Sequence, residues 1–261
     1  MTVCPGISTF VGGDIVAGLY ALDFQKREKV CVLIDLGTNG ELAIGNKERI
    51  LTTSTAAGPA FEGGNILCGM GSVPGAICKV EIREGKAQIR TIGDAKARGI
   101  CGTGVIDCVY ELVGEGIVDE TGLMEEPYFE TGFPLSEDGQ IRFCQKDVRE
   151  FQLAKSAVRA GLETLILRYG ISWEEIDKVY VAGGFGHKMD IHKAVGIGLF
   201  PAFCEEKVEA VGNTCLQGAV KYLTQKDASE AVERLVEVSE EIGLSGDKNF
   251  QEFYMENMYF L

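Results

Sequence analysis

Residues 30–41 read VCVLIDLGTNGE, and this stretch decides the fold class. Its apolar first part, residues 30–36, is too short for a helix and is stopped by Gly37, which indicates a buried β-strand. Two more strands are expected at residues 41–44 and 49–55, with turn residues between them. The start of the chain's core is therefore predicted to be a three-strand meander with Asp35 near its first turn.

Hairpin and helix patterns follow along the rest of the chain. Residues 77–83 and 87–92 flank a short Gly turn and predict a second hairpin. Apolar residues at helical spacing predict a long helix over 148–169, with Asp147 as its N-cap and Gly170 as its end. Shorter elements are expected at 105–113 (helix), 178–182 (strand), 191–199 (helix), 208–211 (strand), 214–223 (helix) and 229–242 (helix). Alternating strands and helices after a meander indicate an α/β protein with a mixed sheet.

Charge and composition exclude several classes of function. The 261 residues hold 25 Lys and Arg against 39 Asp and Glu, a net charge of −14, with 46% apolar residues. Nucleic acids and anionic lipids require a basic surface, so neither is expected as the main partner, and a bound phosphate would be held by backbone groups. No apolar run approaches the length of a membrane span, and residues 1–20 contain no basic segment typical of a signal peptide. We therefore expect a soluble cytoplasmic protein.

The nine cysteines contain no C-x-x-C pair. Local spacing therefore argues against zinc ribbons, ferredoxin clusters and thioredoxin-like dithiols. Several cysteines lie inside apolar runs, so we expect buried, reduced thiols. The alternatives are a site assembled from distant cysteines, or an exposed redox thiol such as Cys101 in its Gly-rich loop.

The turn after the first strand is the strongest candidate for a ligand site. Asp35 leaves a buried strand into Gly37-Thr38-Asn39-Gly40, where unpaired backbone N–H groups can cradle phosphate oxygens. Thr38 or Asn39 can add a donor, and the Asp35 carboxylate can hold a hydrated Mg²⁺. The alternative is an ordinary hairpin in which Asp35 and Asn39 satisfy the backbone of the turn itself.

A second glycine turn follows the strand at residues 178–182. Gly183, Gly184 and Gly186 would let a flat ring or a phosphate approach the main chain at the carboxyl end of a strand, where open α/β sheets place ligands. The spacing is not G-x-G-x-x-G, so a Rossmann site is not indicated. A tight corner between strand and helix is the competing interpretation.

Two further loops carry weaker signals. Gly102-Thr103-Gly104 opens a helix whose N-terminus could receive an anion, although small residues there also allow close helix packing. Glu62 is the single carboxylate of a glycine-rich loop at residues 58–65. It could position a water molecule or a metal, or it could be a solvated side chain.

Taken together, the glycine motifs resemble a known family. They are, in order, PGISTFVGGDIVAG (residues 5–18), LIDLGTNGE (33–41), GPAFEGGN (58–65), GICGTG (99–104) and VAGGFG (181–186). This set is similar to the carboxy-terminal domain of the reductive activators of corrinoid-dependent enzymes, within the actin, Hsp70 and sugar-kinase superfamily. The resemblance covers nearly the whole chain. It implies the second lobe of that superfamily, an RNase H-like mixed sheet with hairpin and helical insertions.

The resemblance also implies a function. Members of that family use ATP to drive the reduction of a corrinoid methyl carrier from Co(II) to Co(I), with the electron coming from an iron–sulfur cluster in an amino-terminal domain. Asp35 and Glu62 would then be catalytic candidates, with Asp35 at the Mg²⁺. The glycine turns would hold the nucleotide: Gly37, Thr38, Asn39 and Gly40 the phosphates, Gly183, Gly184 and Gly186 the adenosine, and Gly102, Thr103 and Gly104 the wall of the cleft.

The chain departs from the full family pattern, because it has one Asp-Gly-Thr strand turn and lacks a ferredoxin cysteine cluster. Residues 1–261 are expected to form a single lobe, with a helical lead-in at 1–28, an irregular insertion at 114–140 and an acidic tail at 225–261. Phosphate charge is gripped from both sides of such a cleft, so this chain alone should hydrolyse little ATP.

The partners considered are a corrinoid protein, the missing first lobe or ferredoxin-like domain, and a second copy of the chain in a homodimer. A dimerisation or partner-docking domain that keeps the ATPase fold is the main alternative function. A kinase of small metabolites is a weaker one, because the sequence offers no clear general base for it.

Overall fold

The computed structural model describes residues 4–183 and 189–260. The chain divides into two compact units, each assembled from three stretches of sequence. The first unit comprises Met1–Thr55, Ala160–His187 and Glu206–Phe253, and the second comprises Ala56–Arg159, Lys188–Glu205 and Tyr254–Leu261. Of the helices in the described ranges, none is both long and apolar enough to cross a membrane.

The first unit is built on a six-stranded mixed sheet with the order β10-β9-β1-β2-β3-β11. Its strands are β1 (Cys31–Leu36), β2 (Gly40–Gly45), β3 (Ile50–Thr55), β9 (Lys178–Ala182), β10 (Val208–Gly212) and β11 (Ser239–Glu241). The first three form the predicted antiparallel meander. The others add in parallel, β9 beside β1, β10 beside β9 and β11 beside β3. The predicted α/β fold with a mixed sheet is therefore confirmed.

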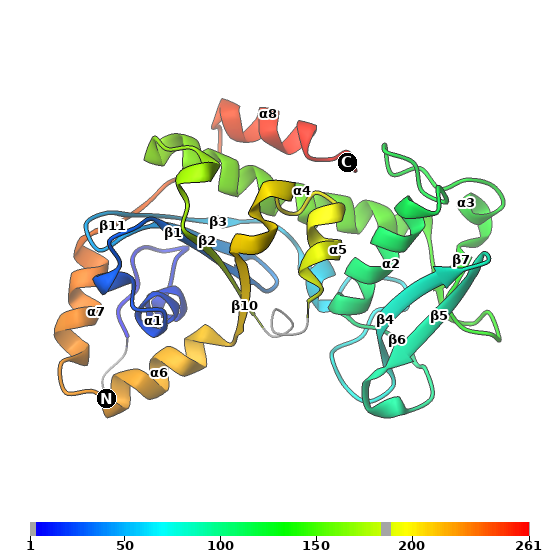
Figure 1. The fold of residues 1–261 in the computed structure, drawn as a ribbon, viewed down its shortest axis with the longest axis horizontal. Helices are drawn as coiled ribbons and strands as arrows, with labels where there is room; N and C mark the ends of the chain where they lie inside the picture. The colour runs from blue at the N-terminus through cyan, green and yellow to red at the C-terminus, as the bar shows by residue number, and fades with distance from the viewer. Residues whose placement is uncertain (1–3, 184–188, 261) are drawn as a thin grey trace. The chain divides into compact units, whose positions relative to one another are not determined.

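Helices cover both faces of this sheet, which explains why β1 is buried along nearly its whole length. Figure 1 shows α1 (Gly13–Ala21), α6 (Thr214–Thr224) and α7 (Ala228–Glu237) on one side. The last part of α4 (Gln145–Tyr169) packs on the other, where a Cβ on Gly161 would lie 2.6 Å from Thr55 Cγ2. The remaining elements that begin in this unit are the 3-10 turns η1 (Phe24–Lys26) and η4 (Trp173–Glu175) and the helix α8 (Lys248–Glu256).

Helices α1 and α6 cross at very short range. A Cβ added to Gly218 of α6 would lie only 1.9 Å from the carbonyl oxygen of Ala17 in α1. On the opposing helix, a Cβ on Gly18 would lie 2.9 Å from Thr214 Oγ1. Two glycines, one from each helix, therefore let the backbones approach to a distance that a side chain would prevent.

The N-terminus of α6 is capped by a side chain, as Asn213 Oδ1 accepts a hydrogen bond from the Leu216 N–H at 2.8 Å. We expect Asn213→Ala to lower the free energy of unfolding by about 1 kcal/mol, because one helix N–H loses its partner. Urea denaturation followed by circular dichroism measures this change. Asn213→Asp is the matched control, since it keeps the accepting oxygen, and an equal loss in both variants would contradict the role of the cap.

The second unit holds two small sheets and the helices around them. The larger sheet has the order β5-β4-β6, with β4 and β5 forming the predicted hairpin. The elements of the second unit are η2 (Pro59–Glu62), β4 (Ala76–Arg83), β5 (Lys86–Thr91), η3 (Ile92–Asp94), β6 (Gly99–Ile100), α2 (Gly102–Gly114), α3 (Tyr128–Thr131), β7 (Phe133–Pro134), β8 (Arg142–Phe143), α5 (Ile191–Gly196) and η6 (Ala202–Lys207, which ends in the first unit). The first part of α4 completes it.

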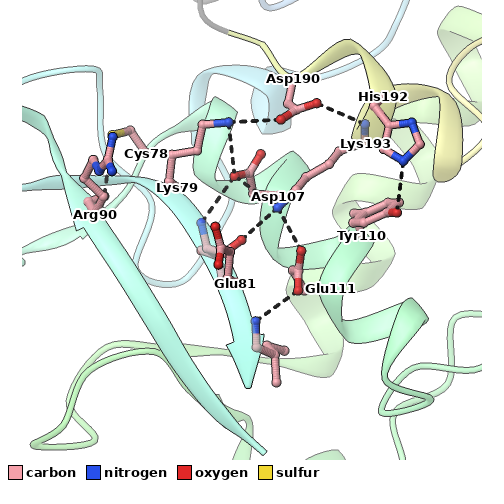
Figure 2. A network of polar contacts seen from close by, with 12 residues as sticks. Cys78, Lys79, Glu81, Arg90, Asp107, Tyr110, Glu111, Asp190, His192 and Lys193 are labelled. Carbon is pink, nitrogen blue, oxygen red and sulfur yellow. Dashed lines mark hydrogen bonds and ion pairs between the residues drawn. The ribbon is translucent and has the colours of Figure 1, made fainter. Parts of the chain in front are cut away.

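A charged network fastens α5 to α2 and β4 (Figure 2). Lys193 Nζ lies 2.8 Å from Glu111 Oε1 and 3.4 Å from Asp107 Oδ2, while Lys79 Nζ lies 3.0 Å from Asp190 Oδ2. Burial raises the pKa of Asp107, and the two lysines oppose that shift. Because Asp107 is only 1% exposed, its charge depends on these cations.

The C-terminal segment lies against the first part of α4. Lys155 Nζ, which is almost fully buried, donates to the Tyr259 carbonyl oxygen at 2.6 Å, and Gln152 Nε2 donates to that of Met258 at 2.7 Å. The ring of Phe260 stacks on Phe151. Burial lowers the pKa of Lys155 to about 8. These contacts fix the last described residues to α4 and place the Phe260 ring in the core of the second unit.

Five details differ from the expectations. α4 begins at Gln145, so Asp147 is not its N-cap; its buried carboxylate instead accepts the Cys144 and Leu67 N–H groups at 2.8 and 2.7 Å. α7 ends at Glu237 and is followed by β11, where a continuous helix was expected. α5 ends at Gly196, short of the expected residue 199, and α8 was not predicted. Cys101 is only 1% exposed, so the hypothesis of an exposed redox thiol there was wrong.

Candidate functional site

The turn between β1 and β2 is short and open. Leu36 pairs with Gly40, so three residues close the hairpin, and the Gly37 N–H donates to the Asn39 carbonyl oxygen at 3.0 Å. Thr38 and Asn39 are exposed. A Cβ on Gly37 would meet nothing closer than the Asn39 oxygen, at 3.8 Å, so the fold of the described chain does not require glycine at this position. The glycine leaves main chain accessible beside Asp35.

The Asp35 carboxyl lies in an acidic and largely buried setting. Its pKa is raised to about 6, mainly by burial and also by the negative charges of Glu41 and Asp14. Glu41 stands directly across the hairpin from Asp35. Its own pKa is raised by burial, against a hydrogen bond from Ser54 Oγ at 3.3 Å. A cation placed here would relieve this repulsion and favour the ionised form of Asp35.

Asp14 and Glu41 are the acidic neighbours that the sequence analysis did not identify as site residues. Asp14 lies in the first turn of α1, and its carboxylate accepts the Ile15 N–H at 2.9 Å. Its place inside the Gly-Gly-Asp motif at residues 12–14 was the available signal. Its proximity to Asp35 depends on how α1 packs on the sheet, which the sequence does not state.

The carboxyl groups of Asp35, Glu41 and Asp14 suit a magnesium ion that is held mainly by water and phosphate. Within the described ranges, no three His, Cys, Asp or Glu side chains are close enough together to bind a metal ion by themselves. Mg²⁺ commonly takes only one or two carboxylates and completes its octahedron with water and phosphate oxygens. One largely buried carboxylate, Asp35, fits that role better than a role in a closed protein cage.

Gly183 ends β9 at the same edge of the sheet as Asp35, because Ala182 pairs with Asp35 in the parallel ladder. Its φ is +116°, and a Cβ there would lie 2.4 Å from the Leu36 carbonyl oxygen. The Gly183 N–H donates to the Gly212 carbonyl oxygen at 3.1 Å. Packing of β9 against β1 therefore requires this glycine, and its contact with adenosine stays a prediction. Gly184 and Gly186 lie outside the described residues.

In the second unit, the other candidates lie together around the start of α2. Glu62 is exposed at the end of η2. A Cβ on Gly102 would lie 1.8 Å from the Phe61 carbonyl oxygen, and one on Gly104 would lie 2.2 Å from that of Ile77. Thr103 is buried, with its Oγ1 3.4 Å from Cys101 Sγ. These glycines allow close packing of α2, which was one of the two interpretations of the motif.

Each unit therefore brings part of the predicted site together. The first places Asp35, the residues 37–40 turn and Gly183 at the carboxyl edge of β1 and β9, where open α/β sheets commonly bind ligands. The second places Glu62 beside Gly102, whose added Cβ would lie 3.5 Å from the Glu62 nitrogen.

Comparison with known proteins finds a matching family and similar proteins whose names refer to the activation of corrinoids or the reduction of a corrinoid protein. The model of a family described as the C-terminal domain of RACo, the ASKHA domain, matches residues 29–261. The corrinoid activation enzyme RamQ of Eubacterium limosum is 34% identical over 282 residues, which cover 100% of this chain and 47% of RamQ. The [Co(II) methylated amine-specific corrinoid protein] reductase of Methanosarcina barkeri is 30% identical over 277 residues, covering 97% of this chain and 50% of that protein.

A solved structure of a reductive activator for corrinoid, iron-sulfur protein superposes with a TM-score of 0.91 at 33% identity, covering 98% of this chain and 44% of that one. The chain thus spans about half the length of the curated relatives it matches. With a family match over residues 29–261 and the mixed sheet described above, the chain belongs to the family of C-terminal ASKHA domains of reductive activators of corrinoid proteins.

Proposed function

We propose that the chain is the ATP-binding domain of an ATP-dependent reductive activator, which returns a corrinoid methyl carrier from inactive Co(II) to Co(I). The observation that carries this proposal is the open turn at residues 37–40 beside the largely buried Asp35 carboxyl, which lies among other acids. One electron is required per cobalt, and we propose that an iron–sulfur cluster in another part of the activator supplies it. We further propose that the protein works in the cytoplasm.

In this proposal the residues of the turn have separate tasks. Main-chain N–H groups of the turn at residues 37–40, other than that of Gly37, which donates to the Asn39 carbonyl oxygen, bind phosphate oxygens. The exposed Thr38 and Asn39 side chains add donors. Asp35 holds the hydrated Mg²⁺, which neutralises phosphate charge. Gly183, with Gly184 and Gly186, lets the adenine ring approach the main chain. Glu62, Gly102, Thr103 and Gly104 of the second unit are further candidates for contact with the nucleotide.

The test compares Mg²⁺–ATP binding by the chain, supplied with the first lobe of a relative, before and after Asp35→Ala. With Mg²⁺ present, we expect at least about tenfold weaker binding in calorimetry, because the carboxylate that holds the ion is lost. With EDTA in place of Mg²⁺, the variant should bind no more weakly than the parent, because a negative charge near the phosphates has been removed.

Asp227→Ala is the control, since Asp227 is an exposed aspartate of the same unit whose side chain caps no helix N–H. Equal losses with and without Mg²⁺ would contradict the metal role of Asp35. A brisk Mg²⁺-dependent ATPase of the chain alone, abolished by Asp35→Ala, would contradict the need for a second lobe.

A docking or dimerisation domain is the second candidate, favoured by a specific observation. The packing of Gly102, Gly104 and Gly183 accounts for these glycines without a nucleotide. In addition, α6 exposes Leu216, Val220 and Leu223 on one face, which suits association with a corrinoid protein or a second copy. Calorimetry with the first lobe supplied separates the two, because a docking domain would show no heat with ATP.

A further inference from the structure

The two long edges of the β5-β4-β6 sheet differ in whether side chains cover their backbone groups. Beyond the two-residue β6, the open edge of β4 is covered by side chains: the Val80 N–H donates to Asp107 Oδ2 at 3.3 Å, and the Ile82 N–H donates to Glu111 Oε2 at 3.0 Å. Lys193 Nζ donates to the Val80 carbonyl oxygen at 2.9 Å (Figure 2). Charged side chains thus block further strand pairing on this side.

These hydrogen bonds also fix which groups of β5 face outward. The N–H groups of Val80 and Ile82 point away from β5. In an antiparallel pair the hydrogen bonds between the strands then come from every second residue, so the residues of β4 on either side of Val80 and Ile82 bond to β5. Val80 and Ile82 stand opposite Ile89 and Ala87. The backbone groups of Ala87 and Ile89 therefore point to the outer edge of β5, and throughout the described ranges β5 pairs with β4 alone.

This outer edge is basic in an acidic protein. From Lys86 to Arg98 the sequence holds four bases, Lys86, Arg90, Lys96 and Arg98, against one acid, Asp94, although the whole chain carries a net charge of −14. All four basic side chains are exposed. Along β5, Lys86 precedes Ala87 and Arg90 follows Ile89, so a basic side chain lies next to each residue whose backbone groups point outward.

A hollow adjoins this edge, and its lining holds two basic residues, Lys96 and Arg98, and two acidic ones, Glu137 and Asp138. It has a volume of about 850 Å³, and Ile89, Lys96 and Arg98 form part of its wall. Across it lie Leu67, which is 71% exposed, and the loop at residues 136–141. An extended chain could lay apolar side chains against Ile89 and Leu67 while its carboxylates reach Lys96 and Arg98.

We propose that β5 is a docking edge for an acidic, extended segment of a partner protein, which adds as a strand beside Ala87 and Ile89. Carboxylates of the segment pair with Lys86, Arg90, Lys96 and Arg98. A second copy of β5 does not suit this edge, because pairing it with itself would bring Lys86 and Arg90 side chains together. A peptide strand is favoured over nucleic acid because its backbone can complete the outward hydrogen bonds of Ala87 and Ile89, and the test includes a single-stranded oligonucleotide.

The test uses a fluorescent library of eight-residue peptides that alternate Glu with Val, Thr or Ile, bound to the 261-residue chain and followed by anisotropy. At least one member should bind saturably below about 1 mM, and binding should weaken as salt is raised. Lys86→Glu combined with Arg90→Glu should weaken it at least about tenfold. The control Lys226→Glu combined with Lys248→Glu changes two exposed lysines elsewhere and should leave it unchanged.

A second variant separates strand pairing from simple charge attraction. Ile89→Pro removes an outward N–H without removing a β4–β5 ladder bond, and proline is tolerated at such edge positions. We expect it to abolish peptide binding while circular dichroism stays unchanged. Absence of saturable binding by the whole library, equal binding of a Lys-for-Glu library or of a single-stranded oligonucleotide, or full binding by folded Ile89→Pro would each overturn the proposal.

Discussion

Gly218→Ala is expected to destabilise the protein by about 3 kcal/mol, although alanine is the better helix former. The new methyl group would lie 1.9 Å from the Ala17 carbonyl oxygen, which belongs to the main chain of α1 and cannot swing aside. Helices α1 and α6 must therefore separate, which opens the core beneath them. Urea denaturation measures the loss, and a fall in Tm of roughly 6–12 °C should accompany it.

Gly114→Ala is the matched control for this change. Gly114 is also a helical glycine, at the end of α2, but a Cβ there would meet nothing within 4 Å. We expect Gly114→Ala to be neutral or to stabilise by up to about 1 kcal/mol, because only the gain in helix propensity remains. If Gly218→Ala and Gly114→Ala changed the free energy of unfolding by the same amount, the close approach of α1 and α6 would be contradicted.

Asp35→Asn should stabilise the protein at neutral pH. An unfolded aspartate has a pKa near 3.8, while burial and the neighbouring acids raise that of folded Asp35 to about 6. Between these values the folded state binds more protons than the unfolded state, so this group makes stability fall as pH rises through that window. Above about pH 6 the full cost is present, up to about 3 kcal/mol.

The difference between parent and Asp35→Asn should therefore be near zero at pH 3.5, grow through pH 4–6 and stay constant above about pH 7. Urea denaturation at these pH values measures it, with Asp227→Asn as the exposed control. A difference that did not change with pH would contradict the buried, acidic setting of Asp35. A stabilising loss of a carboxylate is typical of residues retained for binding and not for the fold.

Local patterns predicted the elements whose signals are local. The β1–β2–β3 meander, the β4–β5 hairpin and the end of α4 at Gly170 were all confirmed. The three-residue strand β11 was missed, because it exists only through pairing with Ile50–Thr52, nearly 190 residues earlier in the chain. The N-terminus of α4 was misplaced because Asp147 binds the Leu67 N–H, a contact from a distant loop.

At the candidate site, too, the sequence predicted the local features but not the contacts between distant parts of the chain. Sequence placed Asp35 and its glycine turn at the end of a buried strand, which the structure confirms. It could not distinguish Gly37, where a side chain would meet open space, from Gly183, where a side chain would meet main chain. Nor could it bring Asp14 into the electrostatic surroundings of Asp35, since that depends on how α1 packs.

The threading of the chain through its two units affects how the protein can be dissected. Each unit takes three separate stretches, so no contiguous piece of the gene encodes either of them. Cutting the chain at any of the five crossings would divide at least one unit between the two pieces. Subcloning either half is therefore expected to yield insoluble or unstructured product. Grafts between relatives should exchange all three stretches of one unit at once.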